Sequence, residues 1–352
     1  MRVLIDIGHP AHVHYFKYFI KIMTEKGHEC LIVARNRGIV FELIKKFQLP
    51  FVSRGTGSKK MIGKMFYLLK ADLKMIKIAK KFKPDIFLGF GSMYAAQAAW
   101  FLRKPSIIFN DTENAKLGQM LYKPFTKTIC TPSCFSEDLG KKQINFNGFI
   151  ELSYLHPNYF KPDESVLDLL KVKPGEKYVI IRFISFNAFH DLTLKGFSLE
   201  EKKKLVHTLS KIVKVFISSE GEIDDELKEF ELDIPPDRLH DALAFSCLHI
   251  GEGVTTTSEC AMMGTPNILV NSYKSGICDE LKQRGLLFQI LNGDEVIEKA
   301  LEIIKSDNFR TEFMKRTAQL IEEKIDPTKF FVWLVENYPK SVKILKSQEQ
   351  KT

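Results

Sequence analysis

Short apolar runs alternate with longer amphipathic segments along this chain of 352 residues. In the first half the runs have the length of buried strands, and the segments between them repeat apolar residues at helical spacing. We predict strands at residues 3–7, 29–34, 51–52, 86–88 and 106–109, with helices over 13–26, 38–47 and 93–102 and a long helix that ends at 82. This alternation predicts an α/β fold, a parallel doubly wound sheet whose functional loops follow the carboxyl ends of its strands.

A second alternation begins after residues 144–163, where two prolines and the lack of a helical period indicate a domain boundary. We therefore predict an N-terminal domain of residues 1–156 and a C-terminal domain of residues 157–330. In the second domain we expect strands at 178–183, 215–218, 267–270 and 286–290, helices over 199–212 and 237–245, and a helical tail over 294–337.

The composition, with 45% hydrophobic and 27% charged residues, is typical of a soluble globular protein. No window of eighteen uncharged apolar residues is present and a strand-like run begins at once, so we expect neither a spanning helix nor a signal peptide, and a cytoplasmic location. The six cysteines lack paired C-x-x-C spacing, which favours reduced thiols over disulfides or a zinc site.

Positive charge is concentrated in the first half. The net charge of the chain is +9, and residues 1–156 contain 25 Lys and Arg against 11 Asp and Glu, which gives +14. The remainder contains 27 against 32, which gives −5. A basic surface can meet nucleic acid, anionic lipid or phosphorylated substrates, but no nucleic-acid motif accompanies this one. We therefore expect no nucleic-acid partner, and a solvated lysine-rich surface is the plain alternative.

Residues 248–270 combine a buried strand, a hydroxyl-rich turn and a helix. They read L-H-I-G-E-G-V-T-T-T-S-E-C-A-M-M-G-T-P-N-I-L-V, in which Gly251 and Gly253 allow a tight turn. Hydroxyls and unpaired N–H groups at a helix N-terminus favour an anion such as a diphosphate. The residues concerned are Thr255, Thr256, Thr257 and Ser258. Glu259 is an acceptor-only group suited to a pair of ribose hydroxyls. The alternative is a well-capped helix in a parallel sheet.

The loop after the first strand, D-I-G-H-P-A-H-V-H, carries Asp6 and three histidines. Histidine is the side chain best suited to take a proton near neutral pH, and His12 is our candidate base. The alternative is that His9, His12 and His14 simply cap a helix and form hydrogen bonds with backbone groups. Three nearby histidines also allow a zinc or manganese site, but such a site needs a carboxylate cluster with histidine partners. We therefore expect no metal.

Two further groups of residues follow strand ends. The segment F-N-D-T-E-N-A at 109–115 should face the same sheet edge as His12, and its carboxylates, Asp111 and Glu113, can divide the work of a base and an orienting group. Arg182 ends a strand of the second domain, and Asn187 and His190 follow it in a loop suited to phosphate oxygens. A surface salt bridge is the alternative for the arginine. No D-x-D motif is present, so we expect neither a metal nor a cofactor besides the substrate.

The stretch 248–270 is similar to the signature G-G-x-x-T-x-x-E-A-x-x-x-G-x-P in the C-terminal domain of GT-B glycosyltransferases and UDP-GlcNAc 2-epimerases. With the start V-L-I-D-I-G-H-P-A-H-V-H and F-N-D-T-E-N-A, nearly the whole chain resembles a family of predicted glycosyltransferases called domain of unknown function 354. The resemblance implies two Rossmann-like domains with parallel sheets facing a central cleft, where the hydroxyls bind the diphosphate of a nucleotide sugar and Glu259 its ribose. It also implies that the last helix, in residues 331–352, packs back on the first domain, and we expect fraying after 340.

Two enzyme classes share this resemblance. The pair His12-Val13 is similar to the Gly-His-Val turn of the GT-B enzyme that adds GlcNAc to the lipid-linked cell-wall precursor, although Ala11 replaces a glycine. Glu113 corresponds to the catalytic glutamate in the H-V-E-A-G segment of hydrolysing epimerases. However, residues 89–92 read G-F-G-S where epimerases have G-D-T, and R-F-I-S-F-N-A-F-H replaces H-R-x-E-N.

We therefore favour a metal-independent glycosyltransferase that moves a sugar from a nucleotide sugar, with UDP as the favoured nucleotide, to an acceptor hydroxyl. Cell-surface polysaccharide or glycolipid synthesis is the expected setting. The alternatives are a hydrolysing epimerase and a non-catalytic subunit that binds a nucleotide sugar.

A lysine-rich segment bears on the location of the acceptor. Residues 59–83 contain nine lysines against one acid, and their apolar residues recur at the steps of an amphipathic helix. The expected core stripe is Ile62, Met65, Phe66, Leu69, Leu73, Ile76 and Ala79. The lysines are either simply solvated or rest on the anionic inner face of a membrane, beside a lipid-linked acceptor.

Overall fold

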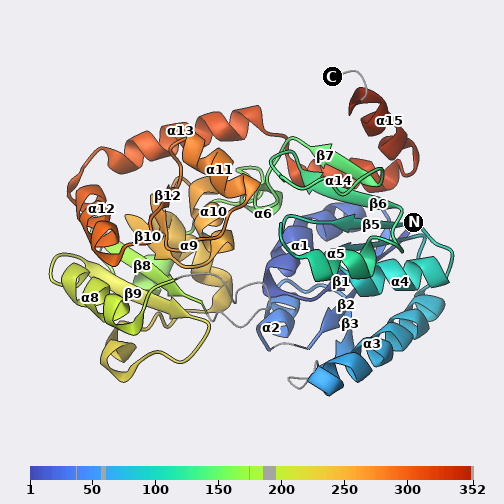
Figure 1. Ribbon diagram of the computed structural model, residues 1–352, viewed down its shortest axis with the longest axis horizontal. Coiled ribbons are helices and arrows are strands. Elements are labelled where there is room, and N and C mark those ends of the chain that lie inside the picture. Colours follow the sequence, from blue (N-terminus) through green and yellow to red (C-terminus); the bar gives the residue numbers. More distant parts are fainter. Residues whose placement is uncertain (37, 57–60, 174, 185–195, 350–352) are drawn as a thin grey trace. The chain divides into compact units, whose positions relative to one another are not determined.

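The computed structural model describes residues 1–36, 38–56, 61–173, 175–184 and 196–349. The chain forms two compact units: unit 1 consists of Met1–Tyr154 and Ile325–Thr352, and unit 2 of Leu155–Lys324. The expected boundary between residues 156 and 157 lies just after this division, and the chain returns to unit 1 before the expected residue 331. Each unit contains one parallel sheet with helices on both faces (Figure 1).

Unit 1 is built on seven strands in the order β3-β2-β1-β4-β5-β6-β7, and all neighbours are parallel. Its central strands are apolar on both faces, as a sheet covered on both sides requires, and β1 buries Val3, Leu4 and Ile5 completely. The strands are β1 (Arg2–Ile7), β2 (Glu29–Arg35), β3 (Phe51–Gly55), β4 (Ile86–Phe90), β5 (Ser106–Phe109), β6 (Thr128–Pro132) and β7 (Gln143–Phe146).

Helices cover both faces of this sheet. One face packs against α3 and α4 around Phe87, and on the other face Phe16 of α1 and Phe331 of α14 both contact Phe109. The helices are α1 (Pro10–Glu25), α2 (Gly38–Lys46), α3 (Met61–Phe82), α4 (Met93–Phe101), α5 (Lys116–Tyr122), α6 (Leu152–Leu155), α14 (Pro327–Glu336) and α15 (Lys340–Glu349).

Unit 2 is built on five parallel strands in the order β12-β11-β10-β8-β9. One face packs against α8 and α12, and the other against α7, α9 and α10. Its elements are α7 (Val166–Leu169), β8 (Tyr178–Phe183), α8 (Leu199–Leu209), β9 (Lys214–Ser219), α9 (Leu239–Phe245), β10 (Leu248–Gly251), α10 (Val254–Met262), β11 (Asn267–Leu269), α11 (Gly276–Gln283), β12 (Phe288–Gln289), α12 (Gly293–Lys305) and α13 (Phe309–Glu323). Together the two sheets confirm the predicted doubly wound α/β fold.

Several elements differ from the sequence pattern. Residues 110–146 contain α5, β6 and β7, where we predicted none, because β6 ends in a proline and β7 has only four residues. The predicted tail helix is divided, since Asn308 and Asp326 begin new helices. The expected fraying after residue 340 is wrong for residues up to 349, which form α15, and the buried Ser341 hydroxyl donates to the Leu334 carbonyl at 2.7 Å.

The core face of α3 differs from the predicted stripe. Ala71, Met75 and Ala79 are buried, whereas Leu69 and Leu73 are 65% and 69% exposed, so the prediction was wrong for these leucines. α4 buries four alanines, and small residues on both helices allow a close approach that larger leucines would prevent. The side chains of Ile62, Met65 and Phe66 lie outside the described residues. No helix in the described part of the chain combines the length and apolar character needed to cross a membrane.

Candidate functional site

β10, two connecting residues and α10 form the strand, turn and helix predicted for this part of unit 2. Gly251 is required by a close approach, because a Cβ there would lie 2.6 Å from Nε2 of His249. Gly253 is the N-cap of α10, with φ of −96° and ψ of 128°, which any residue can adopt. The turn therefore needs glycine for space at Gly251, and not for a left-handed backbone.

The first turn of α10 offers backbone N–H groups to an anion. Gly253 has no side chain, and no side-chain hydrogen bond caps this helix among the described residues. The first N–H groups of a helix have no intrahelical acceptor and carry the positive end of its dipole. In α10 these groups belong to Val254, Thr255 and Thr256, so this end of the helix suits phosphate oxygens.

The four hydroxyls predicted at this N-terminus do not all face outward. Thr255 is exposed and Thr256 is buried. Thr257 donates to a carbonyl of the preceding turn at 2.8 Å, and Ser258 donates to two such carbonyls at 3.0 and 2.9 Å. Ser and Thr often bond in this way within helices. The structure thus leaves Thr255 open to a ligand and turns the hydroxyls of Thr257 and Ser258 inward.

Glu259 lies in the second turn of α10 and is nearly buried. Its Oε1 lies 3.1 Å from Nε2 of His240 on α9, and the exposed fractions of the two side chains are 7% and 8%. A carboxylate this buried needs hydrogen-bond donors. The sequence identified Glu259 but not His240, because the pair joins two helices whose contact is tertiary.

His249 is a second buried histidine on this side of the sheet. Its Nδ1 lies 3.2 Å from the carbonyl oxygen of Ile180. Burial, helped by the positive charge of Arg182, lowers the pKa of His249 to about 3, so the ring is neutral at pH 7. With Nδ1 donating, Nε2 is an acceptor, and no described group hydrogen-bonds to it. A histidine within an apolar strand was the sequence signal for this residue.

Glu252, which precedes the N-cap, also went unnoticed in the sequence. It is completely buried and accepts the backbone N–H groups of Ile184 at 3.0 Å and Phe197 at 2.9 Å. Its carboxylate also pairs with Lys202 at 3.3 Å. Burial raises the pKa of Glu252, although Lys202 and both N–H groups oppose this rise. A carboxylate between two glycines at the end of a buried strand was the available signal.

The guanidinium of Arg182 is engaged at the edge of the sheet. It donates to Ser218 at 2.6 Å and to Glu220 at 3.2 Å, which corresponds to the salt-bridge alternative. Arg182 is the register partner of Gly251, so it lies at the same sheet edge as the start of α10. The other two residues predicted there, Asn187 and His190, lie outside the described residues.

In unit 1 the three histidines after β1 have different surroundings. His9 is the N-cap of α1 and accepts the N–H of Ala11 at 3.3 Å, as the capping alternative predicted. The ring of His12 lies 5.9 Å from that of Tyr15, and His14 is buried among aromatic rings. Within the described ranges, no three His, Cys, Asp or Glu side chains are grouped as ligands for a metal ion.

Tyr15 links two of the predicted catalytic residues. Its ring stacks on His12, and its hydroxyl donates to Asp111. The hydroxyl of Thr112 donates to the same carboxylate at 3.1 Å. Burial is the largest influence on Asp111 and raises its pKa, while the charge of Glu113 acts in the same direction. A raised pKa suits a carboxylate to accept a proton from a hydroxyl.

Two other acids have structural partners. Glu113 is 3% exposed and accepts the backbone N–H and the hydroxyl of Ser136 at 3.2 and 3.3 Å. Asp6 accepts Nε of Arg54 at 2.8 Å and the hydroxyl of Ser92 at 2.6 Å. Asp6 and Arg54 are both buried, so this network ties β1 to β3 and to the start of α4. Glu113 is therefore held by Ser136, whereas Asp111 is held by Thr112 and Tyr15.

The fold matches solved GT-B structures. UDP-GlcNAc 2-epimerase from Neisseria meningitidis, bound to UDP-GlcNAc, has a TM-score of 0.68 at 12% identity, covering 96% of this chain and 100% of that one. Spinosyn rhamnosyltransferase SpnG, complexed with spinosyn aglycone, has a TM-score of 0.64 at 13% identity, with the same two coverages. At these identities the likeness establishes the fold.

Sequence comparison extends the likeness to a curated glycosyltransferase. UDP-N-acetylglucosamine--N-acetylmuramyl-(pentapeptide) pyrophosphoryl-undecaprenol N-acetylglucosamine transferase of Clostridium perfringens is 24% identical over 341 residues, covering 90% of this chain and 88% of the relative. The family model described as "Protein of unknown function (DUF354)" matches residues 1–339. With a match of that length, and with the two-sheet GT-B fold, the chain belongs to the DUF354 family.

Proposed function

We propose that this protein transfers a sugar from a nucleoside diphosphate sugar, with UDP as the nucleotide, to an acceptor hydroxyl. The observation that carries the proposal is the start of α10, which no side chain caps among the described residues, with Glu259 one turn further along. Support comes from the glycosyltransferase-like fold and from the similarity to an N-acetylglucosamine transferase.

In the proposed donor site the N–H groups of the first turn of α10, with the Thr255 hydroxyl, bind the diphosphate. Thr256 contributes its backbone N–H, Thr257 and Ser258 stabilise the first turn through their hydroxyls, and Glu259 accepts the ribose hydroxyls. Arg182 exchanges Glu220 for a phosphate oxygen and neutralises the leaving diphosphate. Asn187 and His190 complete the site in this proposal.

The proposed transfer exchanges one bond at the anomeric carbon of the sugar for another. The acceptor oxygen forms a bond to the anomeric carbon, and the bond from that carbon to the diphosphate oxygen breaks, so the nucleoside diphosphate leaves with the electron pair. The acceptor proton passes to Asp111, held by Tyr15, with His12 as the alternative base. We propose that no divalent cation takes part. Activity that survives chelation would agree, and a requirement for added Mg²⁺ or Mn²⁺ would contradict this.

The structural likeness to UDP-GlcNAc 2-epimerases supports one alternative. An epimerase acts on UDP-GlcNAc without an acceptor, whereas a non-catalytic subunit binds the donor but does not turn it over, whatever acceptor is added. Incubation with UDP-GlcNAc alone, followed by chromatography, tests for the epimerase. Release of ManNAc and UDP would identify the epimerase and contradict sugar transfer.

A nucleotide screen tests the donor site before an acceptor is known. A ligand that binds the native state raises the melting temperature, so UDP and UDP-sugars should stabilise the protein more than uridine does. In calorimetry Glu259→Ala should weaken UDP binding about tenfold or more, since a hydrogen bond to a charged group is lost. Glu200→Ala, exposed on α8, is the matched control. Equal UDP affinity in the Glu259 variant and the control would remove the assignment.

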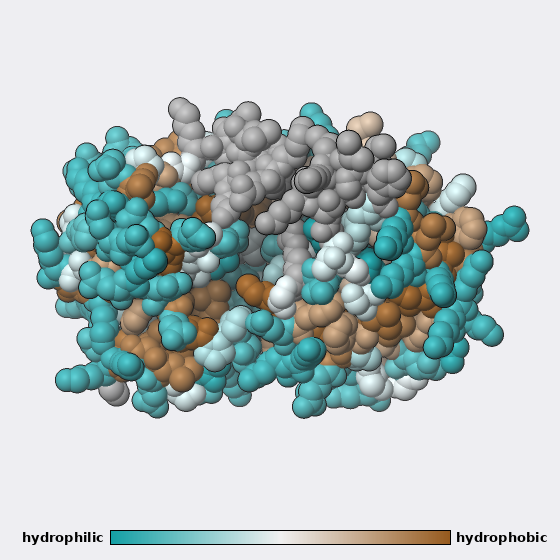
Figure 2. Space-filling model, turned by 90° about the horizontal axis from the view of Figure 1, so that it is seen from below, coloured by the Kyte–Doolittle hydropathy of each residue, from teal (hydrophilic) through white to brown (hydrophobic). Residues whose placement is uncertain are grey.

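We further propose that unit 1 docks on anionic membrane lipid at the cytoplasmic face, beside a lipid-linked acceptor. The docking surface joins α3 and α4. It exposes Leu69 and Leu73 together with Trp100 and Phe101, at 61% and 56%, and apolar patches lie among hydrophilic residues on the right of Figure 2. The exposed lysines around them are Lys70, Lys74, Lys77 and Lys81. Each lysine near an anionic surface contributes about 1 kcal/mol before screening.

Sedimentation with vesicles tests this surface. The protein should pellet with phosphatidylglycerol vesicles at low salt and be released at high salt, and it should not pellet with phosphatidylcholine alone. Changing Lys70, Lys74, Lys77 and Lys81 to Gln should reduce pelleting, as should Leu69→Ser. The matched control changes the same number of exposed lysines elsewhere on unit 1, namely Lys21, Lys45, Lys127 and Lys141. Equal pelleting by both quadruple variants would place the contact elsewhere, and no pelleting would favour a soluble acceptor.

A further inference from the structure

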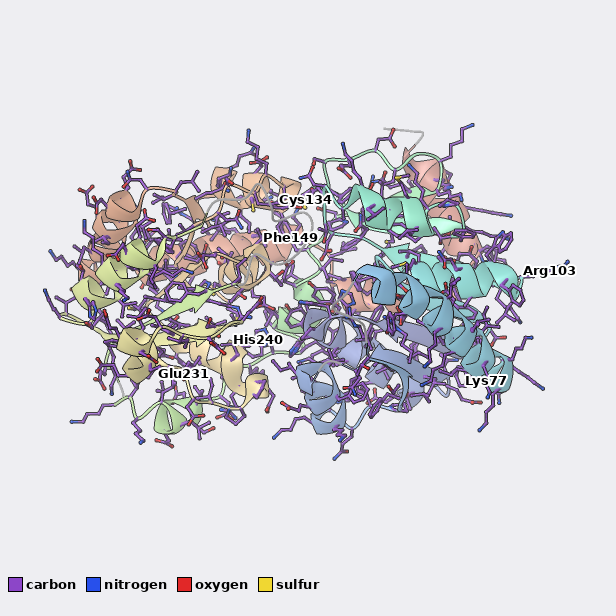
Figure 3. All side chains as sticks on the ribbon, turned by 60° about the horizontal axis from the view of Figure 1, so that its bottom comes forward. Lys77, Arg103, Cys134, Phe149, Glu231 and His240 are labelled. Carbon is purple, nitrogen blue, oxygen red and sulfur yellow. The ribbon has the colours of Figure 1, made fainter. Side chains whose placement is uncertain are left out.

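The carboxylate of Glu259 is held from the side by a histidine on a neighbouring helix. Oε1 of Glu259 and Nε2 of His240 lie 3.1 Å apart, and both side chains are more than nine-tenths buried. His240 lies at the start of α9, where Figure 3 labels it. A glutamate has several rotatable bonds, so a fixed partner is needed if its carboxylate is to meet a ligand in one orientation.

α9 is itself firmly placed, so His240 is a fixed point. The hydroxyl of Tyr178 on β8 donates to the Ala242 carbonyl at 2.6 Å. The carboxylate of Asp241 accepts the backbone N–H of Asp163 at 3.0 Å and lies 3.1 Å from Nε of Arg238. These bonds hold the residues on either side of His240.

The second nearby histidine has a different partner. Nδ1 of His249 lies 3.2 Å from the carbonyl oxygen of Ile180. His240 therefore makes the observed contact with the Glu259 carboxylate, and Oε1 is the carboxylate oxygen that faces the imidazole. A carboxylate has about four lone-pair positions, so it can accept from more than one donor.

We propose that His240 is a positioning residue, which donates Nε2–H to Glu259 and fixes that carboxylate to accept the ribose hydroxyls of a nucleoside diphosphate. This role rests on the proposed function, because it presumes a nucleoside diphosphate at the start of α10. The competing explanation is that the pair only ties α9 to α10. In that case loss of His240 lowers stability but affects ribose and deoxyribose ligands alike.

Calorimetric titration with UDP and with 2′-deoxy-UDP separates these explanations. The wild-type protein should prefer UDP by about tenfold, the effect of one hydrogen bond to a charged acceptor. The preference should fall to about twofold or less in Glu259→Ala and in His240→Leu. His240→Gln, whose amide can donate in place of Nε2–H, should keep most of the preference for UDP. The variant with both Glu259→Ala and His240→Leu should lose no more of this preference than Glu259→Ala alone. His207→Leu, at an exposed position on α8, is the matched control.

The outcomes distinguish the two levels of the claim. If the wild-type protein binds neither nucleotide, the proposed function fails. If it prefers UDP, and Glu259→Ala removes the preference while a folded His240→Leu retains it, the positioning role is wrong and the donor site stands. Thermal melts of each variant establish that it is folded. Weaker binding of both nucleotides by the same factor in His240→Leu would also overturn the positioning role and favour the purely structural pair.

Discussion

The two units each contain a strand that leads directly into a helix, β1 to α1 and β10 to α10, and the two junctions treat the helix N-terminus differently. At α1 the His9 side chain accepts the N–H of Ala11, and Pro10 has no N–H to offer. At α10 the N-cap is Gly253, which supplies no acceptor. The first junction supplies a side-chain acceptor for its backbone donors, while among the described residues the second supplies none.

The side chains around the two junctions also differ in the chemistry that they can support. Near α1 two of the ionisable groups, His12 and Asp111, both contact Tyr15. Near α10 the outward groups are backbone donors and Thr255, suited to phosphate. The difference agrees with the proposed division of labour, in which unit 1 supplies the base and unit 2 binds the donor.

The largest expected effect concerns the rigidity of the β1 junction. Arg54→Leu leaves Asp6 buried without its cation, and it should lower the free energy of unfolding by about 3–5 kcal/mol. Chemical denaturation measures this loss. UDP affinity of the folded variant should not change, because the donor site is assigned to unit 2. A stability loss under 1 kcal/mol would show that the buried Asp6 carboxylate has another partner that compensates its charge. Arg103→Leu, at an exposed position just after α4, is the control.

The second prediction converts the α10 junction into a capped one. Gly253→Asp places a carboxylate where it accepts the N–H groups of the first turn and repels phosphate, so UDP affinity should fall about a hundredfold while helix stability is kept. Its Cβ would meet Ile184 at 3.3 Å, a contact that Gly253→Ala reproduces without the cap. Calorimetry should find UDP binding in the alanine variant. Equal affinity in both variants would remove the first turn of α10 from the site.

The sequence predicted the framework of both junctions because strands and capped helices depend on local patterns. Apolar runs located β1, β8 and β10, and the hydroxyl-rich turn located α10. The partners of individual side chains depended on tertiary packing. The pairing of Glu259 with His240 joins two helices, and the burial of Glu252 depends on backbone N–H groups in distant segments. The exposed Leu69 escaped prediction because the alanines of α4 set the packing distance of α3.

The third prediction concerns the pH dependence of folding stability that the buried His249 of β10 should cause. The pKa of His249 in β10 is lowered from 6.5 to about 3, so between these values the unfolded chain binds more protons than the folded one. Folding stability should therefore fall as the pH is lowered below 6.5, by at most about 1.4 kcal/mol per pH unit from this residue. His249→Gln should reduce that slope in denaturation curves between pH 7 and 5. The exposed His207→Gln should not, and an unchanged slope in the His249 variant would contradict its burial as a neutral ring.

The smallest effect separates two hydroxyls within α10. Thr255→Val removes an exposed hydroxyl and should weaken UDP binding about threefold to tenfold. Thr257→Val removes a bond to the helix backbone, so it should lower stability by about 1 kcal/mol and leave UDP affinity unchanged. Titrations of both variants against wild type measure the contrast. Reversed effects would mean that the hydroxyl of Thr257 turns toward the ligand when UDP binds.

An NMR titration of the protein, labelled with ¹⁵N-threonine, with UDP tests directly whether a diphosphate binds at the start of α10. We expect the amide signals of Thr255 and Thr256 to move saturably, with the dissociation constant found by calorimetry, and uridine without phosphates to move them far less. Thr255→Val identifies one of these signals. UDP binding that leaves both amides unmoved, or no UDP binding at all, would contradict a diphosphate site at the start of α10.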